Sequence, residues 1–364
     1  MRILYKLFLL VLIPFSIYSQ NVIIIVVDGA RYSETFGAGN PNLFIPHLWN
    51  DLKPLGTLFT NFRNEGYTST VPGHSAILTG TWQNIANDGS ERPYKPTLFE
   101  YFRKEIGALE SENYVVAGKE KLNVLNYSTD PDYGSEYNAS YTADDLNDSE
   151  VYSNLISIMD NFHPRLLIVN LASVDKAGHT GIWNNYINAI KKADRLIYKI
   201  YQKIKSDDFY KDSTTIFITN DHGRHDDLHG GFKNHGDSCE GCRHIMLLAL
   251  GRNVSKGKII TQSKFQIDIA KTVGNLLSFN TPKAAGENLF VLSGIEEKSN
   301  TGFNFELFKN YPKLFDHAAA IKYSFNTGMN NKLLINGLLG REVRTLIGRC
   351  RLPVILFKQG NLLY

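Results

Sequence analysis

Carboxylate and imidazole side chains recur in this sequence at places that suit metal ligands. Six of them end apolar runs or stand in the turns that follow: Asp28, Asp175, His179, Asp221, His222 and His235. His225 and His229 are alternatives to the last of these histidines. Two sets of oxygen and nitrogen donors suit two divalent ions of the zinc type. Two such ions about 3.5–4 Å apart can hold the attacking and leaving oxygens of an in-line displacement, so the pattern predicts a two-metal centre.

One hydroxyl stands where it could act as the nucleophile of that displacement. Residues 70–74 read Thr-Val-Pro-Gly-His and are predicted to open a helix. A threonine at a helix start can simply cap the helix, but the same place also offers backbone N–H groups to an anion, and a metal ion can promote loss of the hydroxyl proton. We therefore expect Thr70 to be the nucleophile and a metal ligand, with Ser69 and Ser75 as rival hydroxyls.

Short β-branched runs alternate with helical stretches, and they predict the framework that would position these side chains. The runs are Val22–Val27, Tyr114–Ala117, Leu166–Leu171, Thr215–Thr219 and Ile245–Leu250. Residues 96–104 and 184–205 have apolar side chains at helical spacing. This alternation predicts an α/β domain with a mostly parallel sheet and helices on both faces. Ligands bind beyond the carboxyl ends of such strands, where Asp28, Asp175 and Asp221 are expected.

The two ends of the chain differ in composition from the middle. Residues 1–20 have two basic residues, an apolar run too short to span a bilayer comfortably and a polar exit, which together predict a cleaved signal peptide. We expect a catalytic domain over 21–292, a polar linker over 293–304 and a small β module over 305–364. The protein is then exported to the periplasm, the cell surface or the medium.

Charge and cysteine content disfavour some classes of protein and structure. With 39 basic and 36 acidic residues, nothing indicates the broad positive face that binds duplex nucleic acid. Cys239 and Cys242 form a Cys-x-x-Cys pair, which predicts a local disulfide in an oxidising compartment. A zinc knuckle would need a second cysteine pair, which the sequence lacks. The polar residues 126–150 are expected to form a surface insertion or a solvated loop.

The ordered motifs over roughly residues 21–290 resemble those of the alkaline phosphatase superfamily, in particular the branch of type I phosphodiesterases and nucleotide pyrophosphatases. The resemblance implies a three-layer αβα sandwich, two zinc-type metal ions and a small phosphoric ester as substrate. It also implies that Thr70 attacks phosphorus and becomes a phosphothreonine, which water then hydrolyses.

The resemblance also assigns the ligands to individual ions. The ligands of one ion would be Asp28, Thr70, Asp221 and His222, and those of the other would be Asp175, His179 and His235. Asn87, with Asn84 as its rival, looks like the asparagine that family members place against a nonbridging phosphate oxygen.

Several alternatives stay open within and beyond this family. Sulfatases share the fold, but they carry a Cys/Ser-x-Pro-x-Arg pattern, which Thr70 and His74 do not match. Phosphoglycerate mutase relatives use a serine and further ligands, which are not seen in this sequence. A phosphomonoesterase would place a Lys or Arg near the third phosphoryl oxygen, and Lys119, Lys121 and Arg63 are candidates. A noncatalytic surface-binding protein could keep the fold and metals for stability alone, but it would be expected to lose the nucleophile or several ligands.

The last part of the chain resembles a sorting domain of the type IX secretion system. Residues 305–312 and 338–346 fit that pattern, whereas residues 313–316 read Lys-Leu-Phe-Asp in place of the usual Asn-Pro-Phe-Asn. The resemblance implies that secretion machinery is a partner of the protein, through this module and the N-terminal signal.

Overall fold

The structure is a computed structural model that describes residues 20–290 in full, together with the backbone of six short strands between residues 306 and 363. The chain divides into two compact units, Met1–Val291 and Leu292–Tyr364. The expected signal peptide and linker lie outside the described residues, apart from Gln20 at the end of the signal peptide. Export and sorting therefore stay predictions.

A nine-stranded sheet forms the centre of the first unit, in the order β4-β3-β5-β1-β6-β7-β2-β8, with β9 paired to β2. Its strands are β1 (Asn21–Val27), β2 (Gly56–Arg63), β3 (Asn113–Ala117), β4 (Ser140–Ala143), β5 (Leu166–Leu171), β6 (Thr214–Thr219), β7 (His244–Gly251), β8 (Lys258–Ile260) and β9 (Lys264–Phe265). Only β7 runs antiparallel to its neighbours. The predicted mostly parallel α/β sheet is confirmed.

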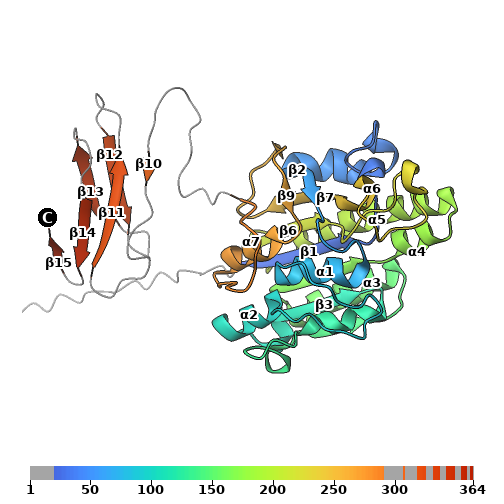
Figure 1. The fold of residues 1–364 in the computed structure, drawn as a ribbon, viewed down its shortest axis with the longest axis horizontal. Helices are drawn as coiled ribbons and strands as arrows, with labels where there is room; N and C mark the ends of the chain where they lie inside the picture. Colours follow the sequence, from blue (N-terminus) through green and yellow to red (C-terminus); the bar gives the residue numbers. More distant parts are fainter. Residues whose placement is uncertain are drawn as a thin grey trace, which may run out of the picture. The chain divides into compact units, whose positions relative to one another are not determined.

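Helices cover both faces of this sheet (Figure 1). They are α1 (Thr70–Thr79), α2 (Leu98–Ile106), α3 (Asp148–Phe162), α4 (Ser173–His179), α5 (Trp183–Ser206), α6 (Glu240–Arg243) and α7 (Asp268–Leu277). Alternate residues of β1 belong to two buried clusters: Val22, Ile24 and Val26 pack with α1, α2 and α7, whereas Ile23, Ile25 and Val27 pack with α3 and α5. Because β1, β5 and β6 are buried on both faces, they consist almost entirely of apolar and β-branched residues.

Residues 126–150 contain more structure than their polar composition indicated. Ser140–Ala143 form β4, an edge strand that pairs in parallel with β3. The side chain of Asn147 accepts hydrogen bonds from the backbone of Ser149 and Glu150, and so caps the start of α3. The segment is polar because an edge strand and a helix cap both face water. It is therefore not simply a solvated loop.

The second unit consists of antiparallel strands. They are β10 (Glu306–Leu307), β11 (Ala318–Ser324), β12 (Asn331–Asn336), β13 (Glu342–Gly348), β14 (Val354–Lys358) and β15 (Asn361–Leu363). One sheet has the order β10-β11-β14-β15, and β12 pairs with β13.

In the described part of the chain, no helix is both long and apolar enough to cross a bilayer.

A close approach between α1 and the end of β6 leads to the first testable prediction. Gly73 lies in the first turn of α1, where a Cβ would come within 2.5 Å of the carbonyl oxygen of Asp221. We expect Gly73→Ala to push the helix away from β6 and to lower the free energy of unfolding by about 1–3 kcal/mol. Gly39→Ala is a matched control, because no atom lies within 4 Å of the added methyl group. Denaturant unfolding curves of equal stability for the two variants would contradict this packing.

Candidate metal centre

Three predicted carboxylates converge at the carboxyl ends of three neighbouring strands. Asp28 directly follows β1, Asp175 lies in α4 just after β5, and Asp221 follows β6 by one intervening residue. Because the sheet order places β5, β1 and β6 side by side, these side chains meet at one edge of the sheet. All three are buried, with exposed fractions of 0%, 4% and 0%. Gly29, at a φ of 66°, turns the chain sharply after Asp28 and leaves room for Arg224 and Asp175 beside it.

The rings of His222 and His235 are held in orientations that suit metal binding. His222 Nδ1 lies 2.8 Å from the carbonyl oxygen of Gly223, and His235 Nδ1 lies 2.9 Å from that of Thr68. A carbonyl oxygen can only accept a hydrogen bond, so in both rings Nδ1 donates and Nε2 keeps a free lone pair. The two rings stack with their centroids 3.9 Å apart. Both Nε2 atoms are thus available as ligands.

Unpartnered atoms at this place indicate that a cation fits between them. The buried atoms Asp221 Oδ2 and His222 Nε2 make no hydrogen bond, although they lie 3.4 Å apart. Beside them, a hydrogen bond of 3.2 Å joins His179 Nε2 and His235 Nε2, and His179 Nε2 lies 3.3 Å from Asp175 Oδ1. Buried polar atoms without partners are costly, and a divalent ion would satisfy acceptors that face one another. The donor set of carboxylates and imidazoles is that of a zinc-type ion.

His74 comes close to the ligands but is already fully hydrogen-bonded. Its donor atom lies within 4.8 Å of those of Asp28 and Asp221. However, His74 Nδ1 donates to the carbonyl oxygen of Thr70 at 2.8 Å, and Nε2 accepts from Asn170 Nδ2 at 3.1 Å. The same amide donates to Asp28 Oδ2 at 2.9 Å. We therefore interpret His74 as a positioning residue and His222, with its free Nε2, as the ligand beside Asp28 and Asp221.

The structure distinguishes His235 from its two rivals but leaves His222 between the two donor sets. His222 Nε2 lies between the two donor sets, because it is 3.7 Å from Asp28 Oδ1 and is also grouped with Asp175 and His235. His225 and His229 instead pair with Asp237 and Asp226, away from this centre.

Lys119 is a central residue that the ligand motifs did not indicate. It follows β3 and is 7% exposed. Its Nζ donates to Asp28 Oδ1 at 3.0 Å, to Thr70 Oγ1 at 3.0 Å and to Asp175 Oδ2 at 2.7 Å. The sequence names Lys119 only as one of three cation candidates for a phosphoryl oxygen, and no motif marks it. Arg63, another of these, is bound to Glu65 and Glu240 instead.

The charges of this cluster perturb one another. Burial opposes the charged form of Lys119, but Asp28 and Asp175 outweigh it and raise the pKa of its ammonium group. Burial, and then the charge of Asp221, raises the pKa of Asp28 despite Lys119. For Asp175, burial acts in the opposite direction, but His179 and Lys119 hold the pKa of the carboxyl well below its usual range. Lys119 is therefore charged, and a further cation would stabilise Asp28 as a carboxylate.

Arg224 is a second buried cation that sequence reasoning missed. It follows the Asp221-His222-Gly223 segment and is fully buried. Its guanidinium group binds Asp175 Oδ1 and also donates to the carbonyl oxygens of Phe232 and Lys233. Its position directly after two expected ligands could have pointed to it. An arginine buried at such a place needs a carboxylate partner. It orients Asp175 and fixes the loop that carries His235.

Thr70 and Asn87 lie together at the start of α1. The N-cap of this helix is Ser69, and Thr70 is its first helical residue, so the Thr70 hydroxyl is not the cap. Asn87 Oδ1 accepts from the backbone N–H of Val71 at 2.9 Å, which places the amide beside Thr70. The rival Ser75 accepts a hydrogen bond from Gln83 within the core.

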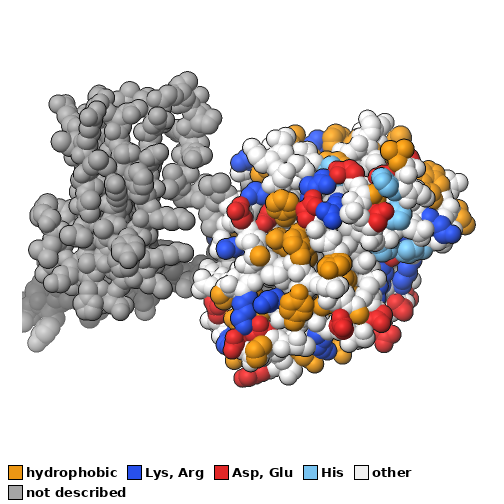
Figure 2. All heavy atoms as spheres, viewed as in Figure 1, with side chains coloured by type: hydrophobic (Ala, Val, Ile, Leu, Met, Phe, Trp, Pro, Cys, Tyr) orange, Lys and Arg blue, Asp and Glu red, His pale blue; other side chains and the backbone are white. Residues whose placement is uncertain are grey.

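An open cavity of about 600 Å³ adjoins the centre. Its lining includes Asp175, His179 and three lysines, which are Lys119, Lys121 and Lys176. Histidine side chains gather at the surface on the side where α4 and α6 lie (Figure 2). Asp88, Glu120 and Asp145 also line it, so the cavity carries charge of both signs, and its lysines are the groups that suit an anionic substrate.

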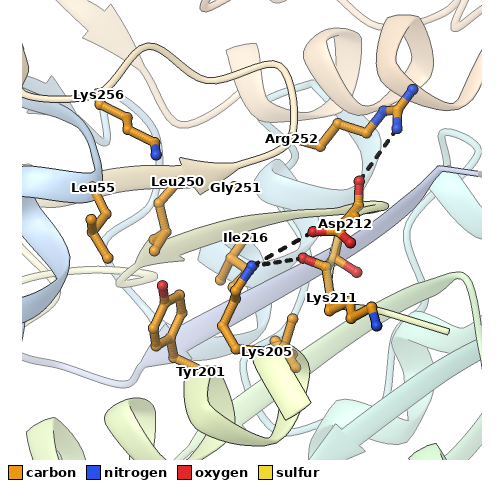
Figure 3. Close-up of a pocket in the computed structure, with 12 residues that line it drawn as sticks. Leu55, Tyr201, Lys205, Lys211, Asp212, Ile216, Leu250, Gly251, Arg252 and Lys256 are labelled. Atoms are coloured by element: carbon orange, nitrogen blue, oxygen red, sulfur yellow. Dashed lines mark hydrogen bonds and ion pairs between the residues drawn. The ribbon is translucent and has the colours of Figure 1, made fainter. Parts of the chain in front are cut away.

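A second cavity, of about 230 Å³, lies at the amino end of β6, beside Thr214 and Gly251. Figure 3 shows lysine and arginine side chains around it. Among the described residues its lining includes one carboxylate, Asp212, and no histidine. Lys205 lies 3.9 Å from that carboxylate. Without a donor set, this cavity is not a candidate for metal-dependent chemistry.

The second prediction concerns His235 and pH. Burial, and then the charge of His222, lowers the pKa of His235 from 6.5 to about 3. The unfolded chain protonates this ring below pH 6.5, whereas the folded protein keeps it neutral, so we expect stability to fall as the pH decreases from 6.5 toward 3. In chelator-treated protein, His235→Asn should weaken this dependence. Unfolding free energies measured across that range with the same slope in both proteins would contradict the prediction.

Comparison with known families agrees with this geometry. Residues 120–281 match the model of a family described as the metalloenzyme superfamily. Curated relatives include the 2,3-bisphosphoglycerate-independent phosphoglycerate mutase of Acinetobacter baylyi, which is 26% identical over 145 residues, covering 40% of this chain and 27% of that protein. The corresponding mutase of Clostridium kluyveri is 24% identical over 212 residues, covering 56% and 40%. The chain thus spans less than half of the length of these relatives.

Solved structures of several enzymes share the fold. A protein in the alkaline phosphatase superfamily from Vibrio parahaemolyticus has a TM-score of 0.57 at 14% identity, covering 94% of this chain and 80% of that one. A phosphonate monoester hydrolase from Silicibacter pomeroyi has a TM-score of 0.57 at 13% identity, covering 94% and 90%. A sulfatase from Pseudoalteromonas sp. has a TM-score of 0.56 at 11% identity, covering 93% and 84%. At these identities the likeness concerns the fold alone. Residues 120–281 are thus similar to the metalloenzyme superfamily, and the fold of the chain is similar to that of alkaline phosphatase-like proteins.

Proposed function

We propose that this protein is a metal-dependent hydrolase of phosphoric esters in which Thr70 is the nucleophile. The observation that carries the proposal is the place of the Thr70 hydroxyl. It is buried, with 1% of the residue exposed, and it lies 3.0 Å from the ammonium group of Lys119 among the metal-ligand carboxylates. A threonine that served only as a helix cap would have no need of this surrounding charge.

The donor groups suit two zinc-type ions, as the sequence predicts. Asp28, Asp221 and His222, with Thr70, would hold one, and Asp175, His179 and His235 would hold the other. Bound there, divalent ions would act as Lewis acids for the phosphoryl oxygens and lower the pKa of coordinated hydroxyl groups.

The protein's own residues then account for the two displacement steps. Thr70 Oγ1 loses its proton to solvent and forms a bond to phosphorus while the leaving group departs with its oxygen. Water later attacks the phosphothreonine, releases phosphate and returns a proton to Thr70. Lys119 is charged, so it cannot take the threonine proton; it donates a hydrogen bond that stabilises the deprotonated oxygen. Asn87 could donate its amide to a nonbridging oxygen, because its Oδ1 is already fixed by Val71.

Lys119 and Lys121 in this cavity favour a monoester over a diester. The phosphoryl group of a monoester carries one more negative charge than that of a diester. Lys119 and Lys121 line the cavity next to Asp175, and burial, followed by the charge of Lys119, lowers the pKa of Lys121. An anionic oxygen placed between the two ammonium groups would relieve their repulsion.

Removal of the nucleophile is the direct test. We expect Thr70→Ala to lower turnover of nitrophenyl phosphate by at least about a thousandfold, because no second hydroxyl replaces the attacking group. Ser69→Ala is the matched control, since the Ser69 side chain makes no capping hydrogen bond. Acid-quenched wild-type protein should carry a phosphoryl group on the peptide that contains Thr70. Full metal-dependent turnover by Thr70→Ala would remove Thr70 from this role.

Lys119 provides a separate test of substrate class. Lys119→Gln should lower kcat/KM for a nitrophenyl monoester by about a hundredfold to a thousandfold, and by less for the diester. Lys176→Gln is the control within the same cavity, because the Lys176 ammonium group is already bound to the carbonyl oxygens of Gly118 and Leu146. The same assay is run with nitrophenyl sulfate, and preferential turnover of that ester would favour the sulfatase-like alternative. An equal loss on monoester and diester would contradict the assigned selectivity.

A further inference from the structure

The loop that follows β6 contains a second collection of metal-binding side chains, outside the candidate metal centre. Six residues between β6 and β7 belong to it: His225, Asp226, His229, Asp237, Cys239 and Cys242. The proposed hydrolysis uses none of them. They form two neighbouring groups of three, in each of which the donor atoms lie within 4.8 Å of one another.

The group of His225, Asp237 and Cys242 contains an imidazole nitrogen that is free to bind an ion. His225 Nε2 is buried and makes no hydrogen bond, and it lies 3.3 Å from Asp237 Oδ2. Cys242 is fully buried, and Cys239 is 8% exposed. Both cysteines are free thiols, so the local disulfide that the sequence predicted is absent. A buried thiol, an unpartnered imidazole nitrogen and a carboxylate that face one another form a typical zinc ligand set.

The neighbouring group of Asp226, His229 and Cys239 is more strongly committed to local hydrogen bonds. Asp226 Oδ1 accepts from the backbone N–H groups of Leu228 and His229. It also lies 2.6 Å from His229 Nδ1, on an imidazole that is half exposed. These contacts already explain the placement of Asp226 and His229 as a capped turn. The thiol of Cys239 instead contacts Asp237 and Cys242 of the first group.

We propose that His225, Asp237, Cys239 and Cys242 bind a zinc-type ion that is separate from the catalytic centre. Structural zinc ions take four ligands in a tetrahedral arrangement, and two cysteines separated by two residues are a frequent pair among them. The second cysteine pair of a zinc knuckle is replaced here by an imidazole and a carboxylate from the same loop. The folded loop brings these together, which the linear spacing does not reveal.

Such an ion would join the two parts of the loop that serve the catalytic centre. Arg224, which binds Asp175, directly precedes His225, and His235 precedes Asp237 by two residues. The backbone is already in close contact here, because Gly223 N donates to the carbonyl oxygen of Cys242 at 2.8 Å. The ion would fix the positions of Arg224 and His235 relative to each other. This inference does not depend on which ester the protein hydrolyses.

Cobalt substitution tests the proposal directly, because sulfur ligands give cobalt a characteristic near-ultraviolet charge-transfer absorption. Among residues 20–290, the catalytic centre offers only oxygen and nitrogen donors, so this absorption would report the loop alone. The full chain is prepared with Cys350→Ser, which leaves Cys239 and Cys242 as its thiols. We expect the sulfur band in this protein and its loss in Cys239→Ser and Cys242→Ser. Ser238→Ala and His229→Ala should keep it.

A thiol titration guards against variants that fail to fold. A mercurial reagent added to the zinc-loaded Cys350→Ser protein should release one zinc ion as the thiol pair reacts, while the remaining zinc stays bound. Cobalt protein with reduced thiols but no sulfur band would overturn the proposal, as would thiols that react without releasing zinc or a disulfide found before any oxidant is added. Loss of the band in His229→Ala would overturn the ligand assignment. Hydrolytic activity is not a readout, so failure here is distinguishable from failure of the proposed function.

Discussion

The burial of three carboxylates at the ends of three adjacent strands is the constraint on which this structure depends. Asp28, Asp175 and Asp221 are almost entirely removed from water, and a buried charge without a partner costs several kcal/mol. Within the described region, Lys119 and Arg224 are the lysine and arginine side chains that contact these carboxylates. Both of them contact Asp175. The charges therefore do not balance within the protein. A divalent cation would supply the missing charge, and the β5-β1-β6 order of the sheet brings the carboxylates close enough to share it.

The surrounding hydrogen bonds fix the ligands before any ion binds. Backbone carbonyl oxygens set the rings of His222 and His235 with Nε2 free. Asn170 holds Asp28 and His74 together, and Gly29 N and His222 N both donate to Asp221 Oδ1. Ligands whose other atoms are committed to the protein lose little freedom on metal binding. The sheet and the loops that follow its strands thus hold these side chains in a single orientation.

The strands and the places of several candidate ligands at the strand ends could be predicted because both leave local signals. A run such as Val22–Val27 is buried on both faces and must be apolar, and the polar residue at its end stands out for that reason. The role of Lys119 could not be predicted in this way. It follows β3, which lies next to β5 in the sheet, so its distance from Thr70 depends on strand order rather than on spacing. The same holds for Arg224 and for the grouping of Cys242 with His225, because each requires loop backbone to fold back on itself.

The place of Lys119 also bears on whether the fold is kept for catalysis or for stability alone. An ammonium group that contacts Asp28 and Asp175 competes with any divalent ion for those carboxylates and repels it. A protein that retained its metals only to stabilise the fold would gain by replacing this lysine with a neutral residue. The ammonium group of Lys119 is useful if negative charge develops beside bound metal ions. The atom that it contacts there is Thr70 Oγ1. A positive charge directed at a buried hydroxyl, at some expense to metal affinity, is a feature that catalysis explains and that a structural role does not.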